Sequence, residues 1–245
     1  MPPIEGEDTS KSDFMQGKTA RVDRIFGKGY KHSASMKVLT FSDEVVSFIY
    51  SPSVRQRFGG VDLIIDCGDT PYGYLEFVVS ALNVPAFYVR GNHSMKVTPL
   101  GGYAEAHGAV DLHGKVINQS GVLFAGIEGC LRYSPGPYQY SQLEMWLHAA
   151  RLIPGLLWNR VRYGRYLDIL VTHAPPWGIH DQPDLPHRGI KAFRWLLQVF
   201  KPSYHFHGHI HTYRPDAVSE TRFGHTQVIN TYPYRMTELK LRWER

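Results

Sequence analysis

Five short polar clusters each follow an apolar run at the point where the run ends, and this arrangement constrains the fold most strongly. The runs are rich in β-branched and aromatic residues, which is typical of buried strands. Because loops converge at the carboxyl ends of strands in open α/β sheets, we expect the polar side chains to meet at one edge. The clusters are Asp43, Gly68-Asp69, Gly91-Asn92-His93, His173 and Gly208-His209-Ile210-His211.

The residue types in these clusters indicate a metal site. Aspartate oxygens combined with histidine nitrogens suit Mn, Fe, Zn or Co better than Ca or Mg. The amide oxygen of an asparagine can bind a metal without adding negative charge, which favours an anionic substrate at the same site. The set is too large for one tetrahedral zinc and suits two metals that share a bridging carboxylate. The candidate ligands are Asp43, Asp69, Asn92, His173, His209 and His211.

Strands and helices are expected to alternate in the first half of the chain. The apolar pattern predicts strands at 38–41, 61–65 and 85–89, with a helix inside 45–58 and another over 74–82. Short crossovers of this kind indicate parallel strand pairing. Residues 1–35 lack any sustained period, so we predict a flexible or loosely packed extension there and a single domain over 36–245.

The second half of the chain has a different order of predicted strands and helices. Runs at 109–117 and 121–126 suit an antiparallel hairpin, and a helix over 139–151 is expected to end at Pro154-Gly155. A strand at 167–171 and a helix at 190–200 follow, and then strands at 204–207, 217–218, 227–229 and 238–242. Parallel units followed by antiparallel ones predict an α/β fold with two packed mixed β-sheets flanked by helices.

Composition sets limits on location and partners. No apolar run approaches the roughly 18 residues that span a bilayer, and the polar start lacks a signal-peptide core, so we expect a soluble cytoplasmic protein without a membrane partner. Cys67 and Cys130 are predicted to be free buried thiols. A net charge of +5 mildly favours an anionic substrate, and the dispersed basic residues indicate no specific nucleic acid. The oligomeric state is left open.

The order and spacing of the clusters resemble the calcineurin-like metallophosphoesterase superfamily over residues 37 to about 230. That family's pattern is Asp-x-His, Gly-Asp, Gly-Asn-His-Asp/Glu, a lone His and Gly-His-x-His. Residues 173–181 and 187–189 are further similar to a small single-domain branch, the brain 239-type metallophosphoesterase-domain proteins. The resemblance implies a four-layer α/β/β/α sandwich.

The resemblance also implies roles for the candidate residues. Asp69 would bridge two divalent transition-metal ions such as manganese, with Asp43 and His211 on the first ion and the remaining ligands on the second. His93 would protonate the leaving oxygen or stabilise charge on the phosphoryl group, which makes His93, Asn92 and Asp69 the catalytic set. The implied activity is hydrolysis of a phosphodiester, or a small phosphomonoester, by a metal-bound hydroxide.

Two positions depart from the family pattern. Val45 stands where the family has a metal-ligand histidine, so the first metal site is expected to be weak or empty. Glu44 is the nearest replacement, but neighbouring residues at a strand end point to opposite sides, so we expect it to face away. Ser94 stands where the family has an acid that orients His93. These departures favour an alternative, a catalytically weakened metal-binding or regulatory protein on the same fold.

The Pro-rich stretch 174–186 is expected to overhang the site. His180 or His187 could contact substrate, and plain loop structure explains them equally well. Trp177 could line a substrate pocket or be a surface aromatic. His205 and His207 are interpreted as packing or supporting groups, because Gly208 separates them from the ligand pair.

Overall fold

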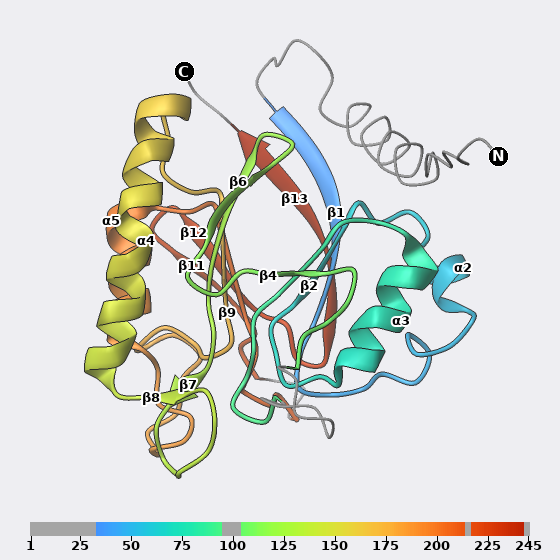
Figure 1. The fold of residues 1–245 in the computed structure, drawn as a ribbon, viewed down its shortest axis with the longest axis horizontal. Coiled ribbons are helices and arrows are strands. Elements are labelled where there is room, and N and C mark those ends of the chain that lie inside the picture. The colour runs from blue at the N-terminus through green and yellow to red at the C-terminus, as the bar shows by residue number, and fades with distance from the viewer. Residues whose placement is uncertain (1–32, 95–103, 214–216, 243–245) are drawn as a thin grey trace, which may run out of the picture.

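Two mixed β-sheets pack face to face, and helices cover both outer faces (Figure 1). The computed structural model describes residues 33–94, 104–213 and 217–242. The first sheet has the strand order β13-β1-β2-β3-β4 and the second has β11-β12-β10-β9-β6-β5. The predicted two-sheet α/β fold is confirmed.

The first sheet contains β1 (Ser33–Phe41), β2 (Leu63–Asp66), β3 (Ala86–Tyr88), β4 (Val110–Asp111) and β13 (Tyr234–Arg242). The second contains β5 (Val116–Gln119), β6 (Val122–Ile127), β9 (Ile169–Thr172), β10 (Tyr204–His207), β11 (Glu220–Phe223) and β12 (Thr226–Asn230). A small ribbon joins β7 (Cys130–Leu131) to β8 (Gln139–Tyr140). The helices are α2 (Val54–Phe58), α3 (Tyr72–Leu82), α4 (Gln142–Tyr163) and α5 (Lys191–Phe200).

Alternating side chains on the buried strands create the layers. In β2, Leu63 and Ile65 join the core between the sheets, whereas Ile64 packs with the core under α2 and α3. In β9, Ile169 and Val171 face the same central core, and Leu170 packs with the core under α4 and α5. Since successive residues of a strand point to opposite faces, fully apolar strands are needed to fill three layers of core.

The prediction for α4 was wrong at its end. A capping box at Ser141, whose hydroxyl accepts from the Glu144 backbone, begins the helix, which then continues through Pro154 to the left-handed Gly164. Pro154 lies on the exposed side, where water can bond the carbonyl that it leaves without a partner. At Gly155 a Cβ would lie 2.9 Å from Val116, so this glycine lets the helix approach β5 closely.

Other predicted boundaries also shift. The run 109–117 divides between β4 and β5, which belong to different sheets, although the β5–β6 hairpin is antiparallel as predicted. Residues 217–218 form no strand, and only Val54–Phe58 of the stretch 45–58 is an α-helix. Residues 33–35 belong to β1, and the rest of the predicted extension lies outside the described residues.

Both cysteines are free and buried, as predicted. Within the described ranges, no helix has the length and apolar character that crossing a membrane requires.

Strand register brings the polar clusters to one edge. Phe41 in β1 pairs with Asp66 in β2, and Asp66 pairs with Tyr88 in β3, so the three parallel strands end together. In the second sheet, Val171 of β9 pairs with Phe206 of β10. The loops after these five strands therefore emerge on the same side of the molecule, between the two sheets.

Candidate metal centre

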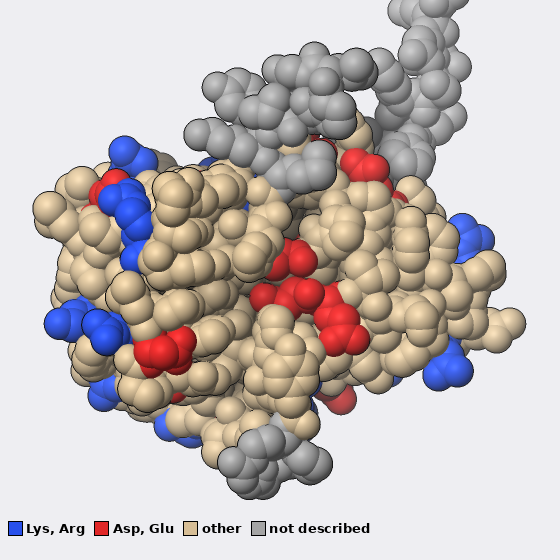
Figure 2. All heavy atoms as spheres, turned by 90° about the horizontal axis from the view of Figure 1, so that it is seen from below, with Lys and Arg blue, Asp and Glu red and all other residues tan. Residues whose placement is uncertain are grey.

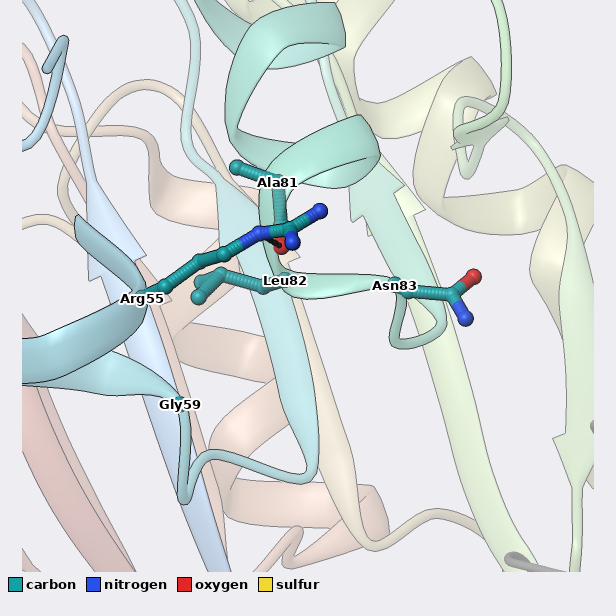
Figure 3. Close-up of a pocket in the computed structure, with 5 residues that line it drawn as sticks. All are labelled: Arg55, Gly59, Ala81, Leu82 and Asn83. Atoms are coloured by element: carbon teal, nitrogen blue, oxygen red, sulfur yellow. Dashed lines mark hydrogen bonds between the residues drawn. The ribbon is translucent and has the colours of Figure 1, made fainter. Parts of the chain in front are cut away.

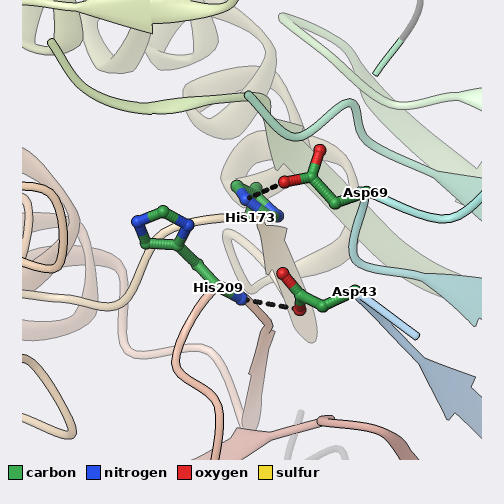
Figure 4. A group of neighbouring side chains, drawn as sticks. All are labelled: Asp43, Asp69, His173 and His209. Carbon is green, nitrogen blue, oxygen red and sulfur yellow. Dashed lines mark hydrogen bonds and ion pairs between the residues drawn. The ribbon is translucent and has the colours of Figure 1, made fainter. Parts of the chain in front are cut away.

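Four side chains with metal-ligand atoms converge at this edge (Figure 4). Asp43 and Asp69 follow strands of the first sheet, and His173 and His209 follow strands of the second. One ligand atom from each lies within 4.8 Å of the ligand atoms of the other three. These four residues, which we call the metal group, span both sheets, and a fifth candidate ligand, Asn92, places its Oδ1 3.1 Å from His173 Nε2.

Backbone hydrogen bonds hold this group in place. The His209 N–H donates to Asp43 Oδ2 at 2.9 Å, which joins the two sheets directly. The Asp43 N–H donates to the Gly68 carbonyl at 3.0 Å, and the Gly208 N–H donates to the His173 carbonyl at 2.9 Å. Each of these loops is therefore hydrogen-bonded to another, and the protein's own backbone fixes the arrangement of the four side chains.

Three of the four residues have unfavourable backbone conformations. Asp43, Asp69 and His209 have φ values of 65°, 62° and 67°, in the left-handed region. Such a conformation costs a non-glycine residue roughly 1–3 kcal/mol and occurs preferentially at functional sites. The sharp turns aim the side chains back into the space between the sheets.

Gly91 and Gly208 permit the close approach of these loops. A Cβ on Gly91 would lie 2.2 Å from Asp69 Oδ1 and 2.6 Å from His173 Cε1. A Cβ on Gly208 would lie 2.7 Å from Asp43 Oδ2. Any side chain at either position would displace a candidate ligand.

Asp66 supports the loop that carries Asp69. Its buried carboxylate accepts hydrogen bonds from the Gly68 N–H at 2.8 Å and from the Thr70 hydroxyl at 2.5 Å. Burial raises the pKa of Asp66 to about 7, although these two hydrogen bonds oppose the shift. Asp66 therefore positions the loop without belonging to the ligand group.

Lone pairs from three groups meet around His173. The His173 Nδ1–H donates to the Cys67 carbonyl at 2.8 Å, which leaves Nε2 as the free nitrogen. Nε2 lies 3.1 Å from Asn92 Oδ1 and 3.2 Å from Asp69 Oδ2. The Asn92 amide nitrogen donates to the Tyr133 hydroxyl at 3.0 Å, so its oxygen faces His173.

A cation fits this arrangement. Asp69 Oδ2 is buried and accepts no well-aligned hydrogen bond from the part of the chain that the structure describes. Three acceptor atoms at one point need either an extra proton on His173 or a metal ion between them. An imidazole nitrogen, a carboxylate and an amide oxygen are suitable donors for a divalent transition metal.

The charges of the metal-free group follow from burial and pairing. Burial lowers the pKa of His173, but the charge and hydrogen bond of Asp69 outweigh it and raise this pKa to about 9. Burial raises the pKa of Asp69, and the His173 imidazolium outweighs that effect and lowers it to about 2. In the absence of an ion, a proton on His173 thus neutralises part of the site.

His209 is held neutral with one nitrogen free. Burial, together with the charge of His173, lowers the pKa of His209 to about 4. Its Nε2–H donates to the Pro186 carbonyl at 2.8 Å, so Nδ1 carries the free lone pair. This is the protonation state that a metal-ligand histidine requires.

The first predicted metal site is less complete. His211 Nε2 lies 3.6 Å from Asp43 Oδ1, but His211 is not among the four residues that share the tight group. Its ring stacks on Tyr232 at 4.5 Å between centroids, and its Nδ1 lies 2.7 Å from the Tyr213 hydroxyl. Hydrogen bonding to Asp43 raises the pKa of His211.

Nothing in the described chain replaces the histidine missing at Val45. Val45 is 40% exposed, and Glu44 Oε2 accepts a hydrogen bond from the Tyr232 hydroxyl at 2.8 Å. Glu44 is therefore directed to Tyr232 and lies outside the group of four. Among the described residues, Asp43, Asp69 and His211 are the ligands left for a first ion.

His93 lies at the exposed rim of the group. Its backbone N–H donates to Asp69 Oδ1 at 2.8 Å, and the residue itself is exposed. Ser94 accepts a hydrogen bond from the Gly91 N–H at 2.9 Å, and its hydroxyl lies 3.5 Å from Asp69 Oδ1. Ser94 therefore stabilises the loop that carries Asn92 and His93.

The two loop histidines occupy different places. The His187 ring lies 5.4 Å from the His209 ring between centroids, and its Nδ1 lies 2.7 Å from Asp184 Oδ2. His180 is hydrogen-bonded to His207 at 2.8 Å and to Thr221 at 2.9 Å, so both of its nitrogens have protein partners. His187 thus borders the metal group, whereas His180 joins a buried cluster beside it.

That cluster contains the two histidines interpreted as packing or supporting groups. His205 and His207 are fully buried in β10. His205 Nε2 bonds the Thr172 hydroxyl at 2.8 Å, next to His173 in sequence. They pack behind the ligand loops of the second sheet.

Sequence reasoning missed Tyr133 and Tyr232. Tyr232 follows β12 and belongs to the same edge of the second sheet, so extending the strand-end argument to that strand could have identified it. Tyr133 follows the two-residue strand β7, which has no periodic signal. Its contact with Asn92 is therefore visible only in the folded chain.

The face that bears the site is acidic at its centre. Figure 2 shows Asp and Glu gathered in a hollow, with Lys and Arg around the periphery. A shallow pocket between α2 and α3 (Figure 3) lies elsewhere; its lining includes Asn83, which caps α3 just before β3 begins. That pocket is at the opposite edge of the first sheet from the metal group.

Comparisons with known proteins agree with this geometry. The sequence model described as calcineurin-like phosphoesterase matches residues 36–213. One solved crystal structure is 13% identical, with a TM-score of 0.58, and the match covers 86% of this chain and 99% of that one. The protein TT1561 of Thermus thermophilus is 16% identical with a TM-score of 0.56, over 81% of this chain and 89% of its own.

These two structures show that the fold is shared. No curated protein matches the chain, and the similarity to the 239-type branch stays a prediction. The family match spans all the candidate ligands, from Asp43 to His211. The chain therefore belongs to the calcineurin-like phosphoesterase family.

Proposed function

We propose that this protein is a metal-dependent phosphoesterase that hydrolyses a phosphodiester or a small phosphomonoester. One observation carries the proposal: Asn92 Oδ1 and Asp69 Oδ2 lie 3.1 and 3.2 Å from His173 Nε2. Among the described residues, none donates a well-aligned hydrogen bond to Asp69 Oδ2. A divalent ion bound there supplies polarisation of a phosphoryl oxygen and activation of water.

The second metal position is the stronger one. Asp69, Asn92, His173 and His209 would hold that ion, because their donor atoms are buried and fixed by protein hydrogen bonds. Asp43, Asp69 and His211 would hold a first ion weakly, because Val45 offers no donor. Mn, Fe, Zn and Co suit this mixture of nitrogen and oxygen.

His93 is the proposed proton donor to the leaving oxygen. It is exposed at the rim of the group, and its backbone is fixed by the bond to Asp69 Oδ1. Ser94 stands where the family has an acidic residue, so no carboxylate orients the His93 ring from that position. A less well oriented proton donor and a weaker first site favour substrates with good leaving groups, which is why we place diesters such as aryl or cyclic phosphates first.

The surroundings support a small substrate. Lys and Arg lie at the periphery of the part of this face that the structure describes (Figure 2), so the face presents no basic groove for a long polyanion. The Pro-rich loop contains a hollow lined by Trp177, Asp181 and Arg188, among other residues, and the same loop carries His187 to the metal group. We propose that this loop contacts the organic part of the substrate, with His187 nearer to the phosphate than His180.

The experiment uses Mn²⁺-loaded protein and generic aryl phosphodiesters and monoesters. We expect hydrolysis that is lost on removal of the metal and on Asp69→Asn or His209→Ala. The exposed turn residue His225 gives a matched control, and His225→Ala should keep full activity. Metal-loaded protein that hydrolyses none of these esters contradicts the proposal.

A specific observation favours the second candidate, a metal-binding or regulatory protein with weakened turnover. Val45 lacks a donor, and Ser94 serves the Gly91 loop instead of His93. Metal counting on the same sample distinguishes the two candidates: full occupancy with turnover supports the enzyme, and one tightly held ion without turnover supports the alternative.

A further inference from the structure

Helix α4 carries an apolar stripe on its outer side. Six exposed positions alternate in steps of four and three along the whole helix: Leu143, Leu147, Ala150, Pro154, Leu157 and Val161. Leu143 is 71% exposed and Val161 is 82% exposed, at the two ends of the stripe. This spacing is the seven-residue repeat of a helix that packs against another helix.

The stripe is separate from the face that anchors α4 to the domain. Met145, Ala149, Leu152 and Leu156 point inward and belong to the core under the second sheet. Helix α4, which carries the stripe, lies in an outer layer of the molecule (Figure 1). Monomers rarely expose a continuous apolar patch larger than a few hundred Å², so this second apolar face indicates a protein contact.

The stripe is symmetric in sequence about Leu152. Leu143 and Val161 are equally far from this residue, as are Leu147 and Leu157, and Ala150 and Pro154. Trp146 and Trp158, which flank the stripe and are 36% and 66% exposed, are also equally far from Leu152.

A two-fold axis places each residue of such a set opposite its counterpart in a second copy. In a two-fold interface, residue i contacts residue j and j contacts i. Two α4 helices that cross antiparallel at Leu152 would therefore align large apolar residues with large apolar residues. The small side chains of Ala150 and Pro154 would lie at the centre, where the helices approach most closely.

The charges fit the same alignment. Glu144 and Arg160 are also equally far from Leu152, and both are exposed or partly exposed near opposite ends of the helix. The antiparallel arrangement brings the N-terminal end of one helix, where Glu144 is paired with Arg132, to the basic C-terminal end of the other, and it aligns the helix dipoles favourably. A parallel arrangement would place like charges together.

We propose that the protein forms a homodimer through antiparallel packing of α4 against α4 of a second copy. The helix has 22 residues and is about 33 Å long. Its exposed apolar side chains, including the two tryptophans, offer several hundred Å² per chain, which approaches the roughly 800 Å² per partner of a stable interface. The metal group lies at the strand ends between the two sheets, whereas the stripe faces away from the core under the second sheet.

The first test measures the mass of the full chain in solution by light scattering. We expect twice the 28.0 kDa chain mass for the wild type and the single-chain mass for Leu157→Lys. Val199 on α5 is a matched control, because it is 44% exposed and lies off the stripe; Val199→Lys should stay dimeric. A wild type that is monomeric at micromolar concentration overturns the proposal, whatever else covers the stripe.

The second test reports orientation and does not depend on loss of folding. Residues 147 and 157 are ten positions apart, so two copies of residue 147 would lie about 15 Å apart along the antiparallel axis. Disulfides need Cα atoms within about 7 Å. Under mild oxidation we expect the double variant Leu147→Cys, Leu157→Cys to form a cross-linked dimer and Leu147→Cys alone to form none.

Cys67 and Cys130 are buried and leave the cross-linking result unambiguous. Cross-linking by Leu147→Cys alone indicates a parallel contact, and absence of cross-linking in the double variant indicates no contact at this stripe. Either result overturns the proposal. A thermal unfolding transition of Leu157→Lys close to that of the wild type serves as the check that the domain is folded.

Discussion

The backbone N–H of His209 donates to Asp43 Oδ2 at 2.9 Å, and this bond links the two sheets within the metal group. Asp43 comes from the first sheet and His209 from the second, so the orientation of one ligand depends on the loop of the other. Both residues also have left-handed backbones. The group is therefore assembled by the packing of the two sheets, and mutations that disturb one ligand are expected to affect its neighbours.

Replacement of Asp43 separates its structural role from its charge. Asp43→Asn keeps an acceptor for the His209 N–H, whereas Asp43→Ala leaves that donor without a partner. We expect Asp43→Ala to be less stable than Asp43→Asn by about 1–3 kcal/mol, since an unsatisfied donor costs that much. Urea unfolding with a chelator present measures the difference. Equal stabilities would show that the bond contributes nothing to the fold.

Val45→His restores the donor that the family pattern has at this position. We expect the first site to bind its ion at least about tenfold more tightly, by analogy with the loss that follows removal of groups around a metal. The rate of hydrolysis should rise as well. Calorimetric titration with Mn²⁺ measures the affinity for the second ion bound, which occupies this weaker first site. Val45→Ala is the control. An unchanged affinity for this ion and an unchanged rate would mean that another residue already completes the first site.

Gly91→Ala tests the close packing of the ligand loops. Because the added Cβ would lie 2.2 Å from Asp69 Oδ1, we expect the variant to lose most of its metal affinity. Gly73 in α3 is the control, since a Cβ there has no atom within 4 Å, and Gly73→Ala should bind metal normally. Equilibrium dialysis measures both variants. Normal metal retention by Gly91→Ala would contradict the described packing.

Metal binding is expected to depend on pH through His173. The folded pKa of about 9 lies above the ordinary value of 6.5, so the metal-free protein keeps a proton on this ring at neutral pH. An ion must displace that proton. The apparent affinity for the ion at the His173 position, which binds first, should therefore rise about tenfold per pH unit below pH 9 and level off above it. In the metal-free protein the stabilisation from the His173–Asp69 pair is complete between about pH 4 and 6.5, is lost as the pH rises through 9, and is lost again as the pH falls through about 2.

Calorimetry in buffers with different ionisation enthalpies counts the released protons. At pH 7, about one proton should be released for each ion that binds at the His173 position. His209 is already neutral at this pH, because its pKa is about 4, and should contribute none. An affinity that does not change between pH 6 and 8 would exclude His173 as the group that exchanges a proton for the ion.

The sequence was informative wherever strand ends carry chemistry. Asp69 and His173 follow strands whose apolar runs are short and distinct, so both the strands and their shared edge could be predicted. The end of α4 could not, because Pro154 interrupts the local pattern while the exposed position tolerates it. The run 109–117 crosses from one sheet to the other, a tertiary event that leaves no periodic signal.

The details of the site depend on contacts between distant loops. The Tyr232 hydroxyl donates a hydrogen bond to Glu44, and the Tyr232 ring stacks on His211. Neither contact follows from a local sequence pattern. The contact of Tyr133 with Asn92 has the same character. Candidate ligands could thus be named from residue type and order, whereas the hydrogen bonds that orient these side chains follow only from the packed sheets.

The most direct test of the account measures bound metal and turnover together. Metal-free protein is titrated with Mn²⁺, and the ions bound per chain are counted while an aryl phosphodiester is supplied. We predict that hydrolysis appears as the site of Asp69, Asn92, His173 and His209 fills, and that His209→Ala neither retains this ion nor turns over substrate. Full occupancy of that site without hydrolysis would contradict the enzymatic function.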